Sequence, residues 1–149
     1  MQRKPPAQLL EFLAPYPLEV KKLFLATRKT VFEYTPRATE VVVDAANAVA
    51  TGCTFTHSST QGFIHIAAYS TNVNLGFNFG AELSDPKQLL LGEGTKVRHI
   101  SIRSLDDLND LYLHGLIRQA VAKAYRPRPP LTPTTIVKVM KGRRRRPTS

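Results

Sequence analysis

The feature that most restricts the fold is a pair of strand patterns, Asn72–Phe79 and Lys96–Arg103, separated by a glycine-containing loop. In the first segment, apolar side chains alternate with asparagine or glycine, and the apolar set is Val73, Leu75, Phe77 and Phe79. Successive side chains of a β-strand point to opposite faces, so this period of two predicts a half-buried strand. The sheet that contains it is expected to have one packed face and one polar face.

Further strands are predicted upstream of this pair. Glu40–Ala45 alternates in the same way, and Asn47–Gly52 is typical of a turn or a short second strand. Gly62–Ser70 is a further strand pattern, and only Thr71 and Asn72 separate it from the next one. A two-residue connection of this kind predicts a β-hairpin.

Two amphipathic helices are predicted at either end of the strand region. Leu18–Tyr34 places apolar residues three and four positions apart, which is the helical period. Leu105–Ala124 does the same, with Ser104 as the expected N-cap. Strand followed by strand, flanked by helices, favours an α+β architecture. Residues 1–125 are therefore predicted to form one α+β domain, an antiparallel sheet of four to five strands with both helices on one face.

The C-terminal residues differ from the rest of the chain in composition. Residues 126–149 hold eight of the 21 basic residues and no acidic residue, so most of the net charge of +10 lies there. Four prolines between 127 and 133 prevent a helix from continuing. We expect a flexible, basic, Pro/Arg-rich tail, although the β-prone stretch Thr135–Met140 leaves open that it adds a strand or docks on a partner.

The tail also suggests a weak interaction with nucleic acid. Five positive charges fall within six residues, at Lys141, Arg143, Arg144, Arg145 and Arg146. Such a run can contact phosphates without reading sequence, and its binding depends strongly on salt. No aromatic residue follows Tyr125, so base stacking is expected to add little. A solvated terminus is the alternative explanation of the same run.

A small polar cleft is the predicted ligand site, and a solvated strand surface is the alternative interpretation of the polar stripe Asn72, Asn74 and Asn78 that would line it. Its candidate residues are polar side chains on neighbouring strand segments, Asp44, Asn47, Asn74, Arg98 and His99. Arg98 and His99 are adjacent on a strand and point to opposite faces. Arg98 shares the face of Ile100 and Ile102, where an arginine needs a carboxylate or carbonyl partner. An anion-binding role for Arg98 is the alternative.

No complete catalytic group or metal site is predicted. Cys53 and His57 have a spacing that two metal ligands use, but no second cysteine or acidic pair accompanies them. A buried thiol is the simpler interpretation, and His65, in the middle of a strand, is expected to be a structural histidine. We therefore predict no catalytic residues and no metal ligands, and the sequence identifies no cofactor.

The chain resembles a known family in two segments, which read NLGFNFGAELSDPKQLLLGEGTKVRHISIR and, upstream, VDAANA at residues 43–48. They resemble the YdhG-like family, domain of unknown function 1801, over roughly Leu9 to Ala124. Asp44 lies in the upstream segment, and the resemblance makes it the candidate partner of Arg98 in an ion pair. The resemblance implies the same α+β fold and a domain without an established general activity. It also implies an alternative role as a frataxin-like intracellular iron chaperone, which requires clustered carboxylates. Here the only cluster is Asp106, Asp107 and Asp110.

The sequence thus favours a non-enzymatic binding module whose partner is an unknown small ligand or a protein. A single cysteine excludes an intramolecular disulfide and fits a reducing compartment. The N-terminus lacks the apolar run of a signal peptide, and no stretch of about 18 apolar residues is present. We expect a cytoplasmic protein that does not interact with membranes.

Overall fold

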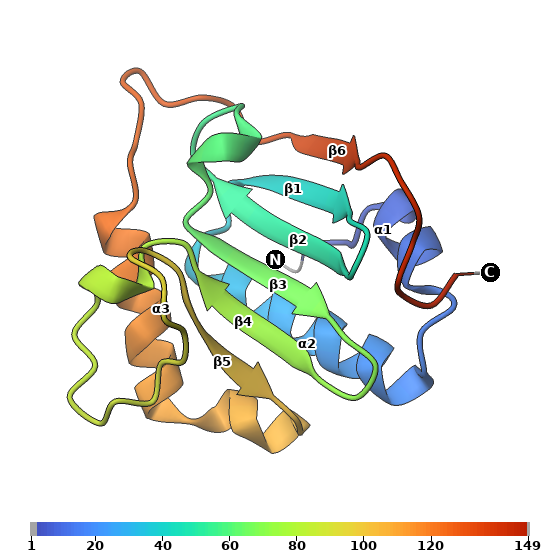
Figure 1. Ribbon diagram of the computed structural model, residues 1–149. Helices are drawn as coiled ribbons and strands as arrows, with labels where there is room; N and C mark the ends of the chain where they lie inside the picture. The colour runs from blue at the N-terminus through green and yellow to red at the C-terminus, as the bar shows by residue number, and fades with distance from the viewer. Residues whose placement is uncertain (1–2, 149) are drawn as a thin grey trace.

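A six-stranded sheet in the order β5-β4-β3-β2-β1-β6 organises the molecule (Figure 1). Its strands are β1 (Thr39–Asp44), β2 (Val49–Thr54), β3 (Ile64–Ala68), β4 (Val73–Phe77), β5 (Arg98–Ile102) and β6 (Thr135–Val139). Neighbours are antiparallel except β1 and β6, which are parallel. The computed structural model describes residues 3–148. It confirms the α+β class but gives six strands instead of four to five.

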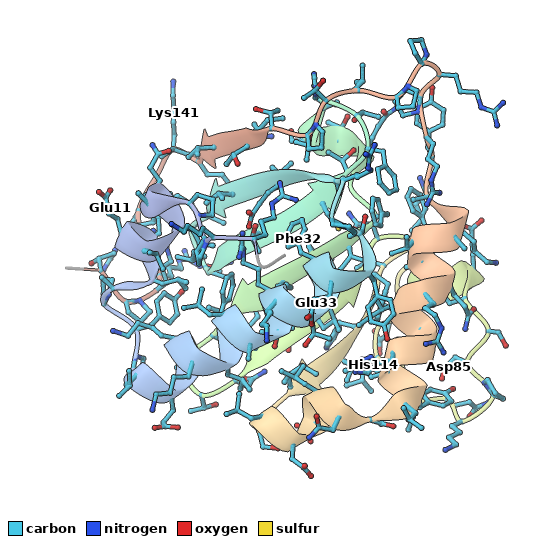
Figure 2. All side chains as sticks on the ribbon, turned by 180° about the vertical axis from the view of Figure 1, so that it is seen from behind. Glu11, Phe32, Glu33, Asp85, His114 and Lys141 are labelled. Carbon is cyan, nitrogen blue, oxygen red and sulfur yellow. The ribbon has the colours of Figure 1, made fainter. Side chains whose placement is uncertain are left out.

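The helices cover one face of this sheet, which we call the helix face. They are α1 (Ala7–Leu13), α2 (Leu18–Tyr34) and α3 (Leu111–Lys123). Figure 2 views the molecule from the helix side and shows α2 lying across the sheet. Register partners share a face, so Val42, Thr51, Ile66 and Leu75 form one row beneath the helices. Every residue of that row is 0–1% exposed. The core therefore lies between the sheet and the helices.

The opposite face of the sheet, which we call the open face, has no helix over it (Figure 1). The alternate residues of each strand lie here, and they are mostly small or polar. One row across the strands contains Val41, Gly52, His65, Gly76 and His99. The polar face that the alternation in Asn72–Phe79 predicted is this surface.

The predicted helix Leu105–Ala124 is instead two elements. A short 3-10 helix, η3 (Leu105–Asn109), precedes α3, and Asp110 lies between them with φ −70° and ψ 118°, outside the helical region. The Asp110 carboxylate accepts a hydrogen bond from the Tyr112 backbone N–H at 3.0 Å and so caps α3. The Ser104 cap is confirmed, since Ser104 and Asp107 form a capping box on η3.

The prediction of a flexible tail over 126–149 is wrong for residues 135–139, which form β6 beside β1, and the alternative that Thr135–Met140 adds a strand is confirmed. Several contacts hold the rest of the segment against the domain. The Arg126 guanidinium lies 4.5 Å from the Phe55 ring centre, and the Thr134 N–H donates to Thr39 Oγ1 at 3.1 Å. The physical reason is that β1 otherwise has an unpaired edge, and the β-branched residues of 135–139 suit it.

A buried ion pair joins α2 to β1. The Arg28 guanidinium donates to both Glu40 carboxylate oxygens, at 2.8 and 2.7 Å, and Thr51 Oγ1 donates to Glu40 at 2.6 Å. Arg28 also donates to the carbonyl oxygens of Arg3 and Lys4, at 3.0 and 3.1 Å. Glu40 is 0% exposed and Arg28 is 2% exposed. The pair therefore fixes the N-terminal segment, α2 and the sheet together.

Candidate functional site

The five residues predicted to line one cleft lie in three separate places. Asn74 and His99 are on the open face, on the neighbouring strands β4 and β5. Arg98 is on β5 but belongs to the helix face, because its register partner is the buried Phe77. Asp44 ends β1, and Asn47 is exposed in the β1–β2 turn. A single cleft containing all five residues is therefore wrong.

The expected ion pair between Asp44 and Arg98 is also wrong. β1 and β5 have three strands between them, and at about 4.8 Å per strand they lie roughly 19 Å apart. Asp44 is in the row of Ile102, so Arg98, at the other end of β5, is farther away still. Asp44 is instead bound by Arg144, whose Nε and Nη2 donate to its two oxygens at 3.1 Å each, and by Arg146. Arg98 Nη1 donates to the Gly94 and Val97 carbonyl oxygens, at 2.6 and 2.8 Å.

The contacts of Asp44 change its pKa. Burial favours the neutral carboxyl, but the hydrogen bonds from Arg144 and Arg146 outweigh burial and lower the pKa of Asp44 below its usual value. Asp44 is therefore ionised at neutral pH and serves as the anchor of the C-terminal segment.

Asn74 and His99 do belong to a polar cluster, which we call the open-face cluster. Its members come from β3, β4 and β5 and from the residue that follows β4, and they are His65, Asn74, Asn78, His99 and Ser101. Asn74 Oδ1 accepts from Asn72 Nδ2 at 3.0 Å and from Ser101 Oγ at 3.2 Å. His65 Nδ1 lies 2.9 Å from Asn78 Oδ1. Cross-strand contacts thus orient His65, Asn74, Asn78 and Ser101 before any ligand arrives.

Gly76 provides the space for this arrangement. The imidazole of His65 lies over it, so that a Cβ at residue 76 would be 2.1 Å from His65 Nε2. Because Asn78 Oδ1 is an acceptor, His65 Nδ1 carries the proton and Nε2 of the neutral ring is a free acceptor. Any side chain at this position would therefore displace the ring that the cluster contains.

The open face has a simple charge pattern. Among the described residues, no position of the six strands that lies on this face is Asp or Glu, whereas Lys138 of β6 and both imidazoles are there. The cluster presents carboxamide, hydroxyl and imidazole groups, which donate and accept hydrogen bonds. Such a surface suits a polar ligand that is neutral or negatively charged.

Asn78 was predicted in the same polar stripe as Asn74, whereas His65 and Ser101 were missed as ligands. Both follow from the same alternation that placed Asn74 and His99 on one face. What sequence alone does not give is the strand order and register, which bring β3 and β5 to either side of Gly76. His65 was expected to be structural, and its bond to Asn78 agrees with that part of the prediction.

Cys53 and His57 do not form a site together. Cys53 is 1% exposed on the helix face, where burial raises the pKa of its thiol, and Sγ contacts the Ile64 carbonyl oxygen at 3.7 Å. His57 is exposed, and its Nε2 lies 2.8 Å from the Thr132 carbonyl oxygen. A buried neutral thiol is a poor nucleophile and a poor metal ligand.

The acidic cluster is occupied by local hydrogen bonds. Asp107 accepts from the backbone N–H groups of Arg103 and Ser104, at 2.9 and 3.1 Å, and these bonds lower its pKa. Asp110 caps α3, and Asp106 accepts from Asn109 at 3.3 Å. Between residues 3 and 148 no group of three or more His, Cys, Asp or Glu side chains is arranged to hold a metal ion.

None of the helices in the described part of the chain has the length and apolar character that a membrane span requires. Comparisons of the chain with protein-family models, with curated proteins and with solved structures found no match. The geometry of the open-face cluster is thus the main support for any functional assignment.

Proposed function

We propose that the protein is a non-enzymatic, YdhG-like binding module that holds a small polar ligand on the open face of its sheet. The observation that carries this proposal is the open-face cluster, in which polar side chains from three strands surround Gly76. Clustered hydrogen-bonding groups that are already oriented lose little entropy on binding. The buried thiol of Cys53 agrees with a reducing compartment, and we propose a cytoplasmic location.

Gly76→Ala is expected to disrupt the cluster without unfolding the protein. The new methyl group requires the His65 ring to move, and a side chain can move more easily than backbone. We expect ligand-dependent NMR shifts of Asn74, His99 and Ser101 in the wild type, using a panel of nucleotides, amino acids and sugar phosphates. In Gly76→Ala the affinity for any compound found is expected to fall about tenfold, equivalent to about 1.4 kcal/mol.

Gly94→Ala is the matched control, because a Cβ at Gly94 would meet no atom within 4 Å. This variant should bind like the wild type. The proposal fails if no compound of the panel shifts the cluster residues, or if the shifts map to another surface. Equal affinity of the Gly76→Ala and wild-type proteins would exclude the His65 region as the site.

A second candidate function is weak, sequence-indifferent binding of nucleic acid through the basic tail. Of the five basic residues predicted for this role, Arg144 and Arg146 are engaged by Asp44. Lys141, Arg143 and Arg145 are exposed, and Lys141 projects from the end of β6 (Figure 2). Three phosphate contacts correspond to a slope of roughly 2–3 in log K against log salt.

Replacing Lys141, Arg143 and Arg145 together by glutamine should abolish binding to a labelled single-stranded oligonucleotide at low salt. Deleting 126–149 is a poorer test, because it also removes β6 and exposes the edge of β1. A variant with Lys21, Lys22 and Lys29 changed to glutamine has the same net charge and serves as the control. If both variants lose binding equally, overall charge and not the tail is responsible.

A further inference from the structure

A small apolar cavity lies between the sheet and the C-terminal end of α3. Its volume is about 200 Å³, and its lining residues are Phe63, Phe77, Phe79, Glu82, Leu83, Ala120, Lys123, Ala124 and Tyr125. Phe63 and Phe77 form the interior and are 4% and 0% exposed, whereas Phe79 and Tyr125 at the mouth are 45% and 64% exposed. Phe77 belongs to the helix face, so this cavity is separate from the open-face cluster.

The size and lining of the cavity select the kind of molecule that fits. An apolar cavity of about 150 Å³ is large enough for benzene. A cavity of about 200 Å³ therefore has room for one six-membered ring with a short substituent. Aromatic walls favour offset or edge-to-face packing with such a ring. Binding would also cover the exposed faces of Phe79 and Tyr125, which removes apolar surface from water.

The mouth of the cavity sets the polarity of the substituent. Lys123 Nζ donates a hydrogen bond to the Glu82 carbonyl oxygen at 3.0 Å. It has no other acceptor among the described residues, so its other two hydrogens can bind a ligand. Glu82 also lines the cavity, so residues of both charges are present there. A charged substituent is attracted by one group and repelled by the other, whereas a hydroxyl can accept from Lys123 and donate to Glu82.

We propose that this cavity is a binding site for an uncharged monocyclic aromatic compound that carries a hydroxyl group. The open-face cluster has no part in it, so this proposal is independent of the proposed function. The bound ring lies between Phe79 and the α3 residues Ala120 and Ala124, with its hydroxyl group at Lys123.

Three probes with the same ring test the class of ligand: benzyl alcohol, benzoate and benzylamine. In methyl NMR titrations of the full chain, we expect benzyl alcohol to shift the signals of Leu83, Ala120 and Ala124 and to bind more tightly than either charged probe. Ala124→Leu places a larger side chain in the cavity and should weaken benzyl alcohol binding at least about tenfold. Phe79→Ser, at the exposed mouth, should weaken it as well.

Ala122→Leu is the matched control, because Ala122 is exposed on the other side of α3 and does not line the cavity. It should bind benzyl alcohol like the wild type. The proposal is overturned if no probe shifts the cavity methyl groups, if benzoate or benzylamine binds more tightly than benzyl alcohol, or if Ala124→Leu and Ala122→Leu have the same effect. Circular dichroism spectra establish that each variant is folded.

Discussion

Replacing Glu40 by alanine should lower the free energy of unfolding by about 3–5 kcal/mol, the usual cost of breaking a buried ion pair. Arg28 would remain buried with neither of its two carboxylate acceptors, and Thr51 Oγ1 would lose its partner. The apolar side chains of the row beneath the helices cannot accept hydrogen bonds, so they cannot replace the bonds that Arg28 and Thr51 lose. Urea denaturation followed by circular dichroism measures the change.

Two variants separate the ion pair from other effects. Glu33→Ala removes an exposed carboxylate from the same region of α2 and should change stability by less than about 0.5 kcal/mol. The double variant Arg28→Leu/Glu40→Leu removes both charges and should be clearly more stable than Glu40→Ala, because no uncompensated charge stays buried. A loss below about 1 kcal/mol for Glu40→Ala would show that water or another group reaches Arg28.

Replacing Asp44 by asparagine should release the C-terminal segment while leaving the rest of the sheet folded. Asp44 accepts charge-assisted hydrogen bonds from Arg144 and Arg146, and losing them costs about 2–3 kcal/mol. Hydrogen exchange of the Met140 amide, which donates to the Asp44 carbonyl oxygen, and of the Ile136 and Lys138 amides on the same side of β6 should accelerate roughly 30- to 150-fold, the factor that this energy represents. Exchange of the β3 and β4 amides should change far less.

The same contact predicts a pH dependence. Because the pKa of Asp44 is lower in the folded protein than its unfolded value of about 3.9, the pairing stabilises the fold above that value. This stability is lost as pH falls through the folded pKa, so β6 exchange should accelerate below about pH 4 in the wild type. Asp44→Asn should lack that transition, and Asp106→Ala should retain it. A wild-type response identical to that of Asp44→Asn would contradict the assignment.

The sequence predicted correctly those elements in which the spacing of apolar residues matches the face that is buried in the folded protein. The alternation in Asn72–Phe79 and the helical period in Leu18–Tyr34 both reflect one buried face, and both became β4 and α2. The region after β5 was less predictable, because Asp110 is compatible with a helix interior and also with a cap. Its side chain bonds to the Tyr112 N–H, and this local contact separates η3 from α3.

Local sequence patterns could not predict the order of the strands in the sheet. That order decides which of the candidate site residues lie close together. Asn74 and His99 were placed together correctly because their strands are neighbours. Asp44 was paired with Arg98 because it lies in a segment that resembles the family, but β1 lies next to β6, which brings Arg144 and Arg146 to Asp44. The tail was expected to be flexible because its prolines and charges resemble those of a disordered segment. The β-prone stretch Thr135–Met140 left a further strand open, but no local pattern shows that its partner is the edge of β1.

The parallel pairing of β6 with β1 also means that the edge of β1 stays unpaired during much of translation. β1 ends at Asp44 and β6 begins at Thr135, so roughly 90 residues must be translated before β1 can gain its second neighbour. At about 5–20 residues per second this takes roughly 5–18 s. Throughout that interval the nascent domain has an open edge whose residues Val41, Val42 and Val43 favour pairing with another strand. In the finished protein β6 covers this edge, so the three consecutive valines of β1 are open to mispairing only while the chain is incomplete.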